Sequence, residues 1–102
     1  MSSPAYAIDA YVLDTLMRDL VAHDRRPSAF LVYLTLAAAA GRGRVAMSYA
    51  QIAEQTGLSR RSVQDAVAIL RKRGLVNAAR GSATETTTYE PLKPWVRSPK
   101  LG

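Results

Sequence analysis

Hydrophobic side chains recur at helical spacing over residues 8–24. Projected at about 100° per residue, they cover nearly half of the helix circumference, with Asp14, Arg18 and Asp19 on the opposite side. The hydrophobic positions are Val12, Leu13, Leu16, Met17, Leu20 and Val21. A helix that covers only its own core shows a narrower hydrophobic face. We therefore expect this helix to pack on two surfaces, one of which belongs to another subunit.

Pro27 interrupts this pattern, and a second helix is predicted over residues 28–40. Its sequence, SAFLVYLTLAAAA, is hydrophobic nearly all the way round, which is typical of a buried helix. Gly41 and Gly43 end the helix, and residues 44–47 (RVAM) form a candidate strand.

Capping residues predict a short third helix over residues 49–56. Ser48 and Gln51 have the spacing of a capping box, in which each side chain bonds to the backbone of the other residue. Ile52 and Ala53 are the inward positions of this helix. Gly57 then stops the helix, because glycine adopts the left-handed conformation that closes a helix at little cost.

Ser59 is expected to cap a fourth helix over residues 60–73. Gly74 ends this helix, and Leu75 stands where a hydrophobic partner for Leu70 belongs. The inward face of the helix carries Val63, Ala66, Val67 and Leu70. Two helices joined by a short turn that contains glycine form a helix-turn-helix.

Two β-favouring runs follow, over residues 75–79 and 84–89, with residues 80–83 as a hairpin tip. They predict a two-stranded wing. The tail over 91–102 contains three prolines and is not expected to continue regular structure, although Trp95 can dock on the body. The prediction is a single domain over 1–102, mainly α, with a core over 28–90.

The positive charge is concentrated in one part of the chain. The 102 residues carry a formal net charge of +6. Residues 59–80 hold six basic residues against Asp65, a net charge of +5, whereas the basic and acidic residues of 1–58 balance. Such a patch favours phosphate groups, because neutralising them releases condensed counterions. Charge alone also allows a merely solvated basic helix.

The stretch SYAQIAEQTGLSRRSVQDAVAILRKRGLV, followed by the hairpin, resembles the winged helix-turn-helix domains of bacterial transcription regulators and of plasmid or phage replication initiators. The likeness covers about residues 28–90. It implies the winged helix-turn-helix fold, with the helix over 8–24 as an addition. It is less informative about function, since this scaffold serves repressors, replication proteins and protein-binding adaptors. The matching positions are Ser48, Ile52, Ala53, Gly57, Ser59, Val63, Val67, Leu70, Gly74, Leu75 and Val76.

The outward face of the helix over 60–73 is the surface expected to enter the major groove of DNA, amino end first. The Arg61 side chain can donate two hydrogen bonds to a guanine edge, and the Gln64 side chain can form a pair of hydrogen bonds with adenine. Asp65 either accepts from cytosine or forms an ion pair with Arg61, and we favour the ion pair. Arg60, Arg71 and Lys72 complete the predicted face.

Phosphate contacts are predicted around this face. Exposed helix amino ends bind phosphate through free backbone amides, which makes Ser48, Tyr49, Gln51 and Ser59 candidates beside their capping roles. Arg80 at the wing is a candidate for a neighbouring phosphate or the minor groove, and Glu85 lies near it in sequence.

The sequence offers little for catalysis. It contains no cysteine, and its single histidine, His23, lacks the partners that a metal site or a general base would need. No glycine-rich phosphate loop is present. We expect no enzyme activity, no metal, no cofactor and no small-molecule substrate. The absence of a long apolar run predicts a soluble protein that does not enter the membrane, and the absence of cysteine fits a reducing cytosol. We expect a cytoplasmic, nucleoid-associated protein.

The favoured hypothesis is a transcriptional regulator, a repressor that occupies its operator on double-stranded DNA as a homodimer. One alternative keeps the DNA contact but assigns the protein to plasmid or phage replication or partition. Another is a winged-helix adaptor that binds protein instead of DNA. For the dimer, Leu13, Met17 and Val21 are the expected central contacts. The competing possibility is that the Trp95 tail or the second helix covers them within one chain.

Overall fold

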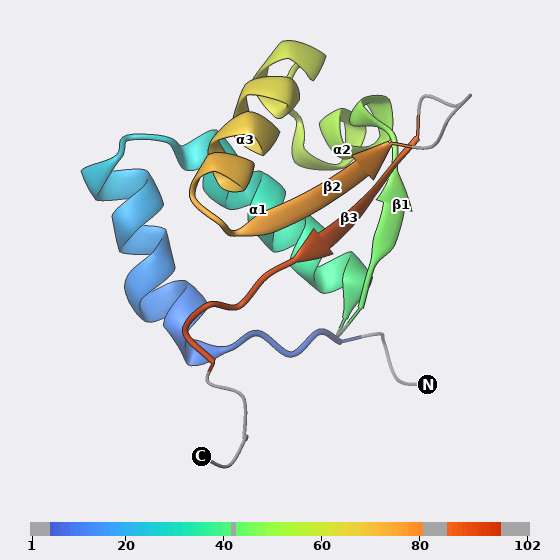
Figure 1. The fold of residues 1–102 in the computed structure, drawn as a ribbon. Coiled ribbons are helices and arrows are strands. Elements are labelled where there is room, and N and C mark those ends of the chain that lie inside the picture. Colours follow the sequence, from blue (N-terminus) through green and yellow to red (C-terminus); the bar gives the residue numbers. More distant parts are fainter. Residues whose placement is uncertain (1–4, 42, 81–85, 97–102) are drawn as a thin grey trace.

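The computed structural model describes residues 5–41, 43–80 and 86–96, and shows helices packed on one side of a small sheet (Figure 1). This confirms the predicted mainly helical fold class with a C-terminal β-hairpin. No helix in the described ranges is long and apolar enough to cross a membrane. In chain order the elements are η1 (Val12–Leu16) and η2 (Arg18–His23), which together form the N-terminal helix, then α1 (Pro27–Ala40), β1 (Val45–Met47), α2 (Tyr49–Thr56), α3 (Arg60–Lys72), β2 (Val76–Arg80) and β3 (Thr87–Pro91).

The N-terminal helix differs from the expected α-helix over 8–24. It is π-helical, with hydrogen bonds that reach five residues back, such as the 2.8 Å bond from the Asp24 amide to the Asp19 carbonyl. Val12, Leu16 and Leu20 are buried against the body. The wider turn places residues four apart nearly in line. The helix therefore buries one row of hydrophobic residues and leaves the neighbouring row outside.

Caps and turns form where the sequence predicts them. The Gln51 amide donates to Ser48 Oγ at 3.1 Å, and the Ser48 amide donates to Gln51 Oε1 at 2.8 Å, which completes the capping box of α2. Gly57 has a φ of 80°, in the left-handed region, and its amide bonds to the Ala53 carbonyl at 2.9 Å. The turn into α3 therefore depends on a backbone conformation that suits glycine.

The carboxyl end of α3 is a Schellman motif. The Leu75 amide donates to the Leu70 carbonyl at 2.8 Å, and the Gly74 amide donates to the Arg71 carbonyl at 3.1 Å. Gly74 has a φ of 72°, and both leucines are buried. The helix ends at Lys72, with Arg73 as its C-cap, so it is one residue shorter than the predicted helix over 60–73. The motif turns the chain directly into β2.

The sheet has three antiparallel strands in the order β1-β3-β2. β2 and β3 form the predicted two-stranded hairpin, and the candidate strand over 44–47, observed as β1, pairs with β3 and extends it, which was not predicted. Val45 of β1 and Ala78 of β2 both pair with Tyr89 of β3. Both strands of the hairpin lie further along the chain than expected, at 76–80 instead of 75–79 and at 87–91 instead of 84–89. Pro91, the last residue of β3, pairs with Val76 at the open end of the hairpin. Proline is tolerated at a strand end. The predicted tip residues 81–83 lie outside the described residues.

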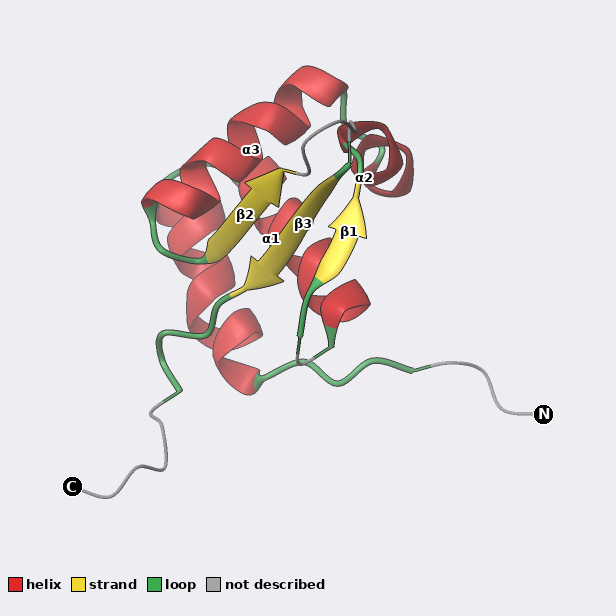
Figure 2. Cartoon of the chain, turned by 45° about the vertical axis from the view of Figure 1, so that its right-hand side comes forward, coloured by secondary structure: helices red, strands yellow, loops and turns green. Residues whose placement is uncertain are grey.

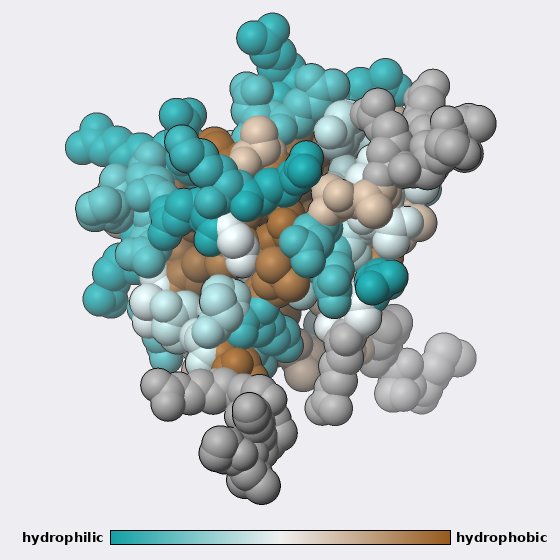
Figure 3. All heavy atoms as spheres, in the orientation of Figure 1, coloured by the Kyte–Doolittle hydropathy of each residue, from teal (hydrophilic) through white to brown (hydrophobic). Residues whose placement is uncertain are grey.

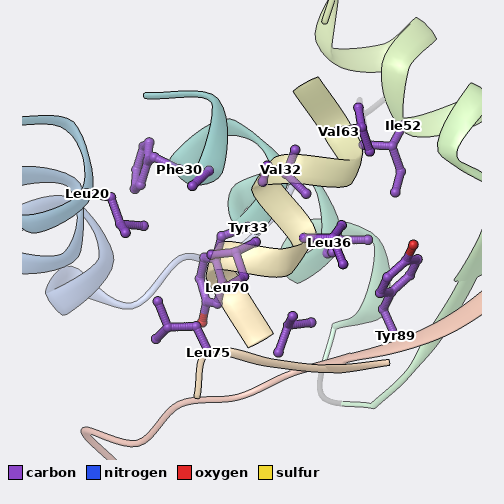
Figure 4. Packing of buried hydrophobic residues seen from close by; sticks show 14 of the residues in the cluster. Leu20, Phe30, Val32, Tyr33, Leu36, Ile52, Val63, Leu70, Leu75 and Tyr89 are labelled. Carbon is purple, nitrogen blue, oxygen red and sulfur yellow. The ribbon is translucent and has the colours of Figure 1, made fainter. Parts of the chain in front are cut away.

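The core lies between the helices and one face of the sheet. Figure 2 shows α1 and α3 behind this face, and Figure 4 shows side chains from the helices and from the sheet converging on α1. α1 is the central helix, as predicted from its sequence. The largest fully buried side chains are Leu20, Val32, Tyr33, Leu36, Ile52, Val63, Leu70, Val76 and Tyr89.

The segment after β3 joins the two ends of the described chain. The Trp95 ring stacks on Tyr11 with 4.6 Å between centroids, and its Nε1 donates to Asp9 Oδ2 at 3.2 Å. The Tyr33 hydroxyl donates to the Leu92 carbonyl at 2.9 Å. Burial, with a smaller contribution from the Asp9 charge, raises the pKa of Tyr33 to about 12. Trp95 therefore covers the start of the N-terminal helix at Tyr11.

Candidate nucleic-acid interface

The face of α3 that points away from the core carries the predicted DNA-contacting side chains. Arg60, Arg61 and Gln64 at its amino half are exposed, as are Arg71 and Lys72 at its carboxyl half. Figure 3 shows hydrophilic side chains gathered over the side of the molecule where α3 lies. The opposite face buries Val63, Ala66, Val67 and Leu70. The amphipathic pattern of α3 thus separates core packing from a polar outer surface.

The favoured ion pair between Arg61 and Asp65 is not formed in the described structure. Both side chains are exposed, and an exposed pair one helical turn apart gains only about 0.3–0.5 kcal/mol, which does not fix two mobile side chains. Arg60 and Gln64 likewise make no side-chain hydrogen bond or ion pair within the described ranges. The amino half of α3 therefore presents polar groups that form no side-chain hydrogen bond or ion pair with the described residues.

The capping residues differ in which of their side-chain hydrogen-bond donors remain unused. Ser59 Oγ accepts from the Ser62 amide at 3.0 Å and donates to Ser62 Oγ at 3.1 Å. Ser48 Oγ accepts from Gln51, but among the described residues it donates to no acceptor. Gln51 uses its Oε1 in the capping box and keeps its amide hydrogens. Ser48 and Gln51 thus retain side-chain donors, whereas the Ser59 side chain is committed to the helix end.

The sheet register places the amino end of α2 beside the wing. Met47, the last residue of β1, pairs with Thr87, and Thr87 also pairs with Arg80. Tyr49 and Arg71, both predicted contacts, line one cavity of about 140 Å³ together with Val67, Ala78 and Thr87. The Arg80 backbone ends β2 at this edge. Its side chain lies outside the described residues.

A second, open groove of about 540 Å³ runs between α3 and β2. It brings Arg71 and Lys72 next to Asn77, which is exposed. The sequence prediction missed Asn77. The alternation of β2, with Val76 buried and Asn77 exposed, is the signal that identifies it as an outward polar residue next to α3. The groove is lined by Ala68, Arg71, Lys72, Val76, Asn77 and Ala78.

Arg73 belongs to a different surface from the other basic residues of α3. Its guanidinium forms an ion pair with Asp24 through Nη1, and its Nη2 lies 3.9 Å from Asp19 Oδ2. One of the six basic residues of 59–80 therefore compensates carboxylates of the N-terminal helix region. Asp24 also faces His23, with 3.0 Å between His23 Nδ1 and Asp24 Oδ1. Arg73 therefore does not belong with the phosphate-facing charge predicted for residues 59–80.

The buried α1, the capped pair α2 and α3 with their glycine turn, and the hairpin of β2 and β3 define a winged helix-turn-helix protein. The chain belongs to the helix-turn-helix domain family, which it matches over residues 26–76. The match runs from the start of α1 to the start of β2. No curated protein and no solved structure matches the chain. Membership of this family indicates DNA as the partner.

Proposed function

We propose that the protein binds double-stranded DNA at specific sequences and acts as a transcriptional repressor that occupies its operator. α3 enters the major groove with its amino end leading. The observation that carries the proposal is the row of exposed side chains on this half of α3, Arg60, Arg61 and Gln64, which have no partner within the described chain.

Base recognition is assigned to two of these residues. Arg61 supplies the planar fork of donors that matches the O6 and N7 atoms of guanine, and Gln64 supplies the donor and acceptor pair that matches adenine. Because Asp65 is not held by Arg61, its carboxylate is also available to accept from cytosine. Arg60, at the first position of the helix, contacts the adjoining phosphate or base of the DNA.

Phosphate contacts surround this centre. Arg71 and Lys72 lie in the groove between α3 and β2, and Ser48 and Tyr49 stand at the amino end of α2. The unused donors of Ser48 and Gln51 suit a phosphate oxygen, and Ser59 contributes its backbone at the start of α3. Arg80, at the end of β2, is assigned to a neighbouring phosphate or the minor groove.

We further propose that the repressor binds as a homodimer, because paired half-sites multiply the affinity of one small module. Leu13, Met17 and Val21 are the central contacts of this dimer. They are exposed, which leaves them open to a second copy.

The test is selection of binding sequences from a random double-stranded DNA pool, followed by titration of the enriched sequence at several salt concentrations. The intact protein should enrich a defined sequence and bind it more weakly as salt rises. Arg60→Ala with Arg61→Ala should lower the affinity by about 30-fold or more, at roughly 1–3 kcal/mol for each arginine removed. The matched control is Arg44→Ala, which removes an exposed arginine at the end of β1 away from Ser48.

DNA binding that enriches no particular sequence from the pool would overturn the proposal that the protein recognises specific sequences. Failure to bind any DNA at low salt would overturn all of it and favour an adaptor whose basic helix meets an acidic protein. A double variant that is folded but binds as tightly as the intact protein would show that α3 is not the contact.

A further inference from the structure

The N-terminal helix exposes a hydrophobic row that nothing in the described ranges covers. Leu13, Met17 and Val21 are 50%, 40% and 36% exposed, although each lies one residue after a buried position. The buried row faces α1, so the exposed row lies on the outside of the molecule, where the N-terminal helix forms one edge (Figure 1). Trp95 packs at Tyr11, before the row begins. Soluble proteins rarely leave such a row without a partner.

Two opposite charges flank this row on the same side. Asp14 follows Leu13, and Arg18 follows Met17, so both lie about a quarter turn round the helix from the hydrophobic row. Both are exposed, and neither forms an ion pair or a side-chain hydrogen bond within the described residues. The surface is therefore hydrophobic in the middle, with one negative and one positive group spaced four residues apart along its rim.

This arrangement is complementary to itself. When two such helices pack antiparallel about a two-fold axis, Met17 meets the partner's Met17, and Leu13 meets the partner's Val21. The rotation keeps the charged rims on the same side of the contact and reverses their direction. Asp14 then lies nearly level with the partner's Arg18, and Arg18 with the partner's Asp14. A parallel pair about a two-fold axis would instead place the two charged rims on opposite sides of the contact, where Asp14 and Arg18 could not pair between copies.

We propose that a second copy of this chain occupies the row, with the two N-terminal helices antiparallel and with reciprocal Asp14–Arg18 ion pairs. The inference rests on the homodimer of the proposed function and adds its surface, its direction and its charge register. One helix pair buries less area than the 1,200–2,000 Å² that is typical of a stable complex, which predicts a dimer of about micromolar strength that DNA reinforces.

The test exchanges charges between copies. Asp14→Arg gives a chain with two positive rim residues, and Arg18→Asp gives one with two negative rim residues. Each variant alone should be shifted by about tenfold or more towards monomer in sedimentation equilibrium. An equimolar mixture should recover the dimer, because every rim contact again joins opposite charges. The double variant Asp14→Arg, Arg18→Asp should also recover it. Glu54→Arg, an exposed charge reversal on α2, is the matched control and should change nothing.

Three results would overturn this arrangement. The first is an intact protein that is monomeric at about 100 µM, well above the micromolar range expected for the dimer, as it would be if another segment of its own chain covered the row. The second is a dimer that Leu13→Glu with Met17→Glu leaves intact. The third is a mixture that does not recover association. Sedimentation without DNA separates this inference from the DNA contact. Sequence-specific binding by a monomer overturns only the dimer, whereas a dimer that binds no DNA supports this inference and overturns the proposed repressor.

Discussion

The two ends of α3 carry arginines in opposite situations. At the amino end, Arg60 and Arg61 point outward and have no ion-pair partner among the described residues. At the carboxyl end, Arg73 is held by Asp24 and lies near Asp19. The same residue type on one helix thus serves two purposes. In the proposed function the unpaired arginines contact DNA, whereas Arg73 fastens the end of α3 to the N-terminal helix region.

The side of the molecule around Asp9 follows the second pattern. Its carboxylate accepts from Trp95 and lies 3.6 Å from the Lys93 ammonium, and Tyr33 bonds to the Leu92 carbonyl. The comparison therefore separates the proposed binding end, at the start of α3, from a bracing end, which comprises the ion pair of Arg73 with Asp24 and the contacts around Asp9. Substitutions at the first should change DNA affinity without changing stability, and substitutions at the second should do the reverse.

The largest effect is expected at the amino end of α3. Arg61→Ala and Gln64→Ala should each lower the preference for the selected sequence over a mismatched one by about 1–3 kcal/mol, because each removes a base contact. Competition titrations with single-base mismatches measure this preference. Unfolding in urea should be unchanged for both variants. If both lost stability and kept their preference, the amino end would be a bracing end too.

The next effect tests the bracing end through pH. The pKa of Tyr33 is 10.0 in an unfolded chain and about 12 in the folded protein, so the folded state keeps the proton longer. The resulting stability is fully present below pH 10 and is lost as the pH rises from 10 towards 12, by up to about 2–3 kcal/mol. Urea unfolding, followed by circular dichroism at pH 9, 10 and 11, measures the loss.

Tyr33→Phe is the matched variant for this pH effect. It should cost about 1 kcal/mol at neutral pH, because the hydrogen bond to Leu92 is lost, and it should flatten the alkaline decline. An equally steep decline in both proteins would assign the effect to other groups.

Ser59 tests whether one residue at the binding end also stabilises the fold. Ser59→Ala removes the cap of α3 and should lower the free energy of unfolding by about 1 kcal/mol, within a range of about 0.5–2 kcal/mol. Ser59→Asn should restore most of this loss, since asparagine caps equally well. Equal stability of Ser59→Ala and the intact protein would contradict the capping role.

The smallest effect compares Arg71 with Arg73. Arg71→Ala should reduce the slope of log affinity against log salt by about one, because one phosphate contact is lost. Arg73→Ala should leave this slope unchanged and lower the free energy of unfolding by less than about 1 kcal/mol, since its ion pairs are partly exposed. A salt slope that falls equally in both variants would place Arg73 on the DNA-binding surface.

Local signals allowed much of the helix-turn-helix to be predicted from sequence. The capping box at Ser48, the glycine turn at Gly57 and the end of α3 at Gly74 each depend on residues within a few positions of one another. The outward face of α3 follows from its periodicity. Contacts between distant segments were missed. β1 joins the wing because Val45 pairs with Tyr89, and Arg73 meets a carboxylate 49 residues earlier.

Two further differences have physical causes that a pattern does not reveal. The run TETTTY favours β-structure throughout, and only pairing with β1 and β2 fixes the start of β3 at Thr87. The π-helical turn of the N-terminal helix changes the angle between successive residues, whereas the sequence projection assumed about 100°. The buried and exposed rows were nevertheless both expected as one wide hydrophobic face.

The docked indole of Trp95 is an intrinsic fluorophore at a defined place in the fold. Trp95 is the only tryptophan of the protein, and it is stacked on Tyr11 and bonded to a carboxylate. Its fluorescence emission therefore reports whether the N-terminal helix and the segment after β3 are held together, without any added label. Because that segment lies at the opposite end of the molecule from the start of α3 (Figure 1), the emission offers a spectroscopic reference while DNA is titrated at the other end.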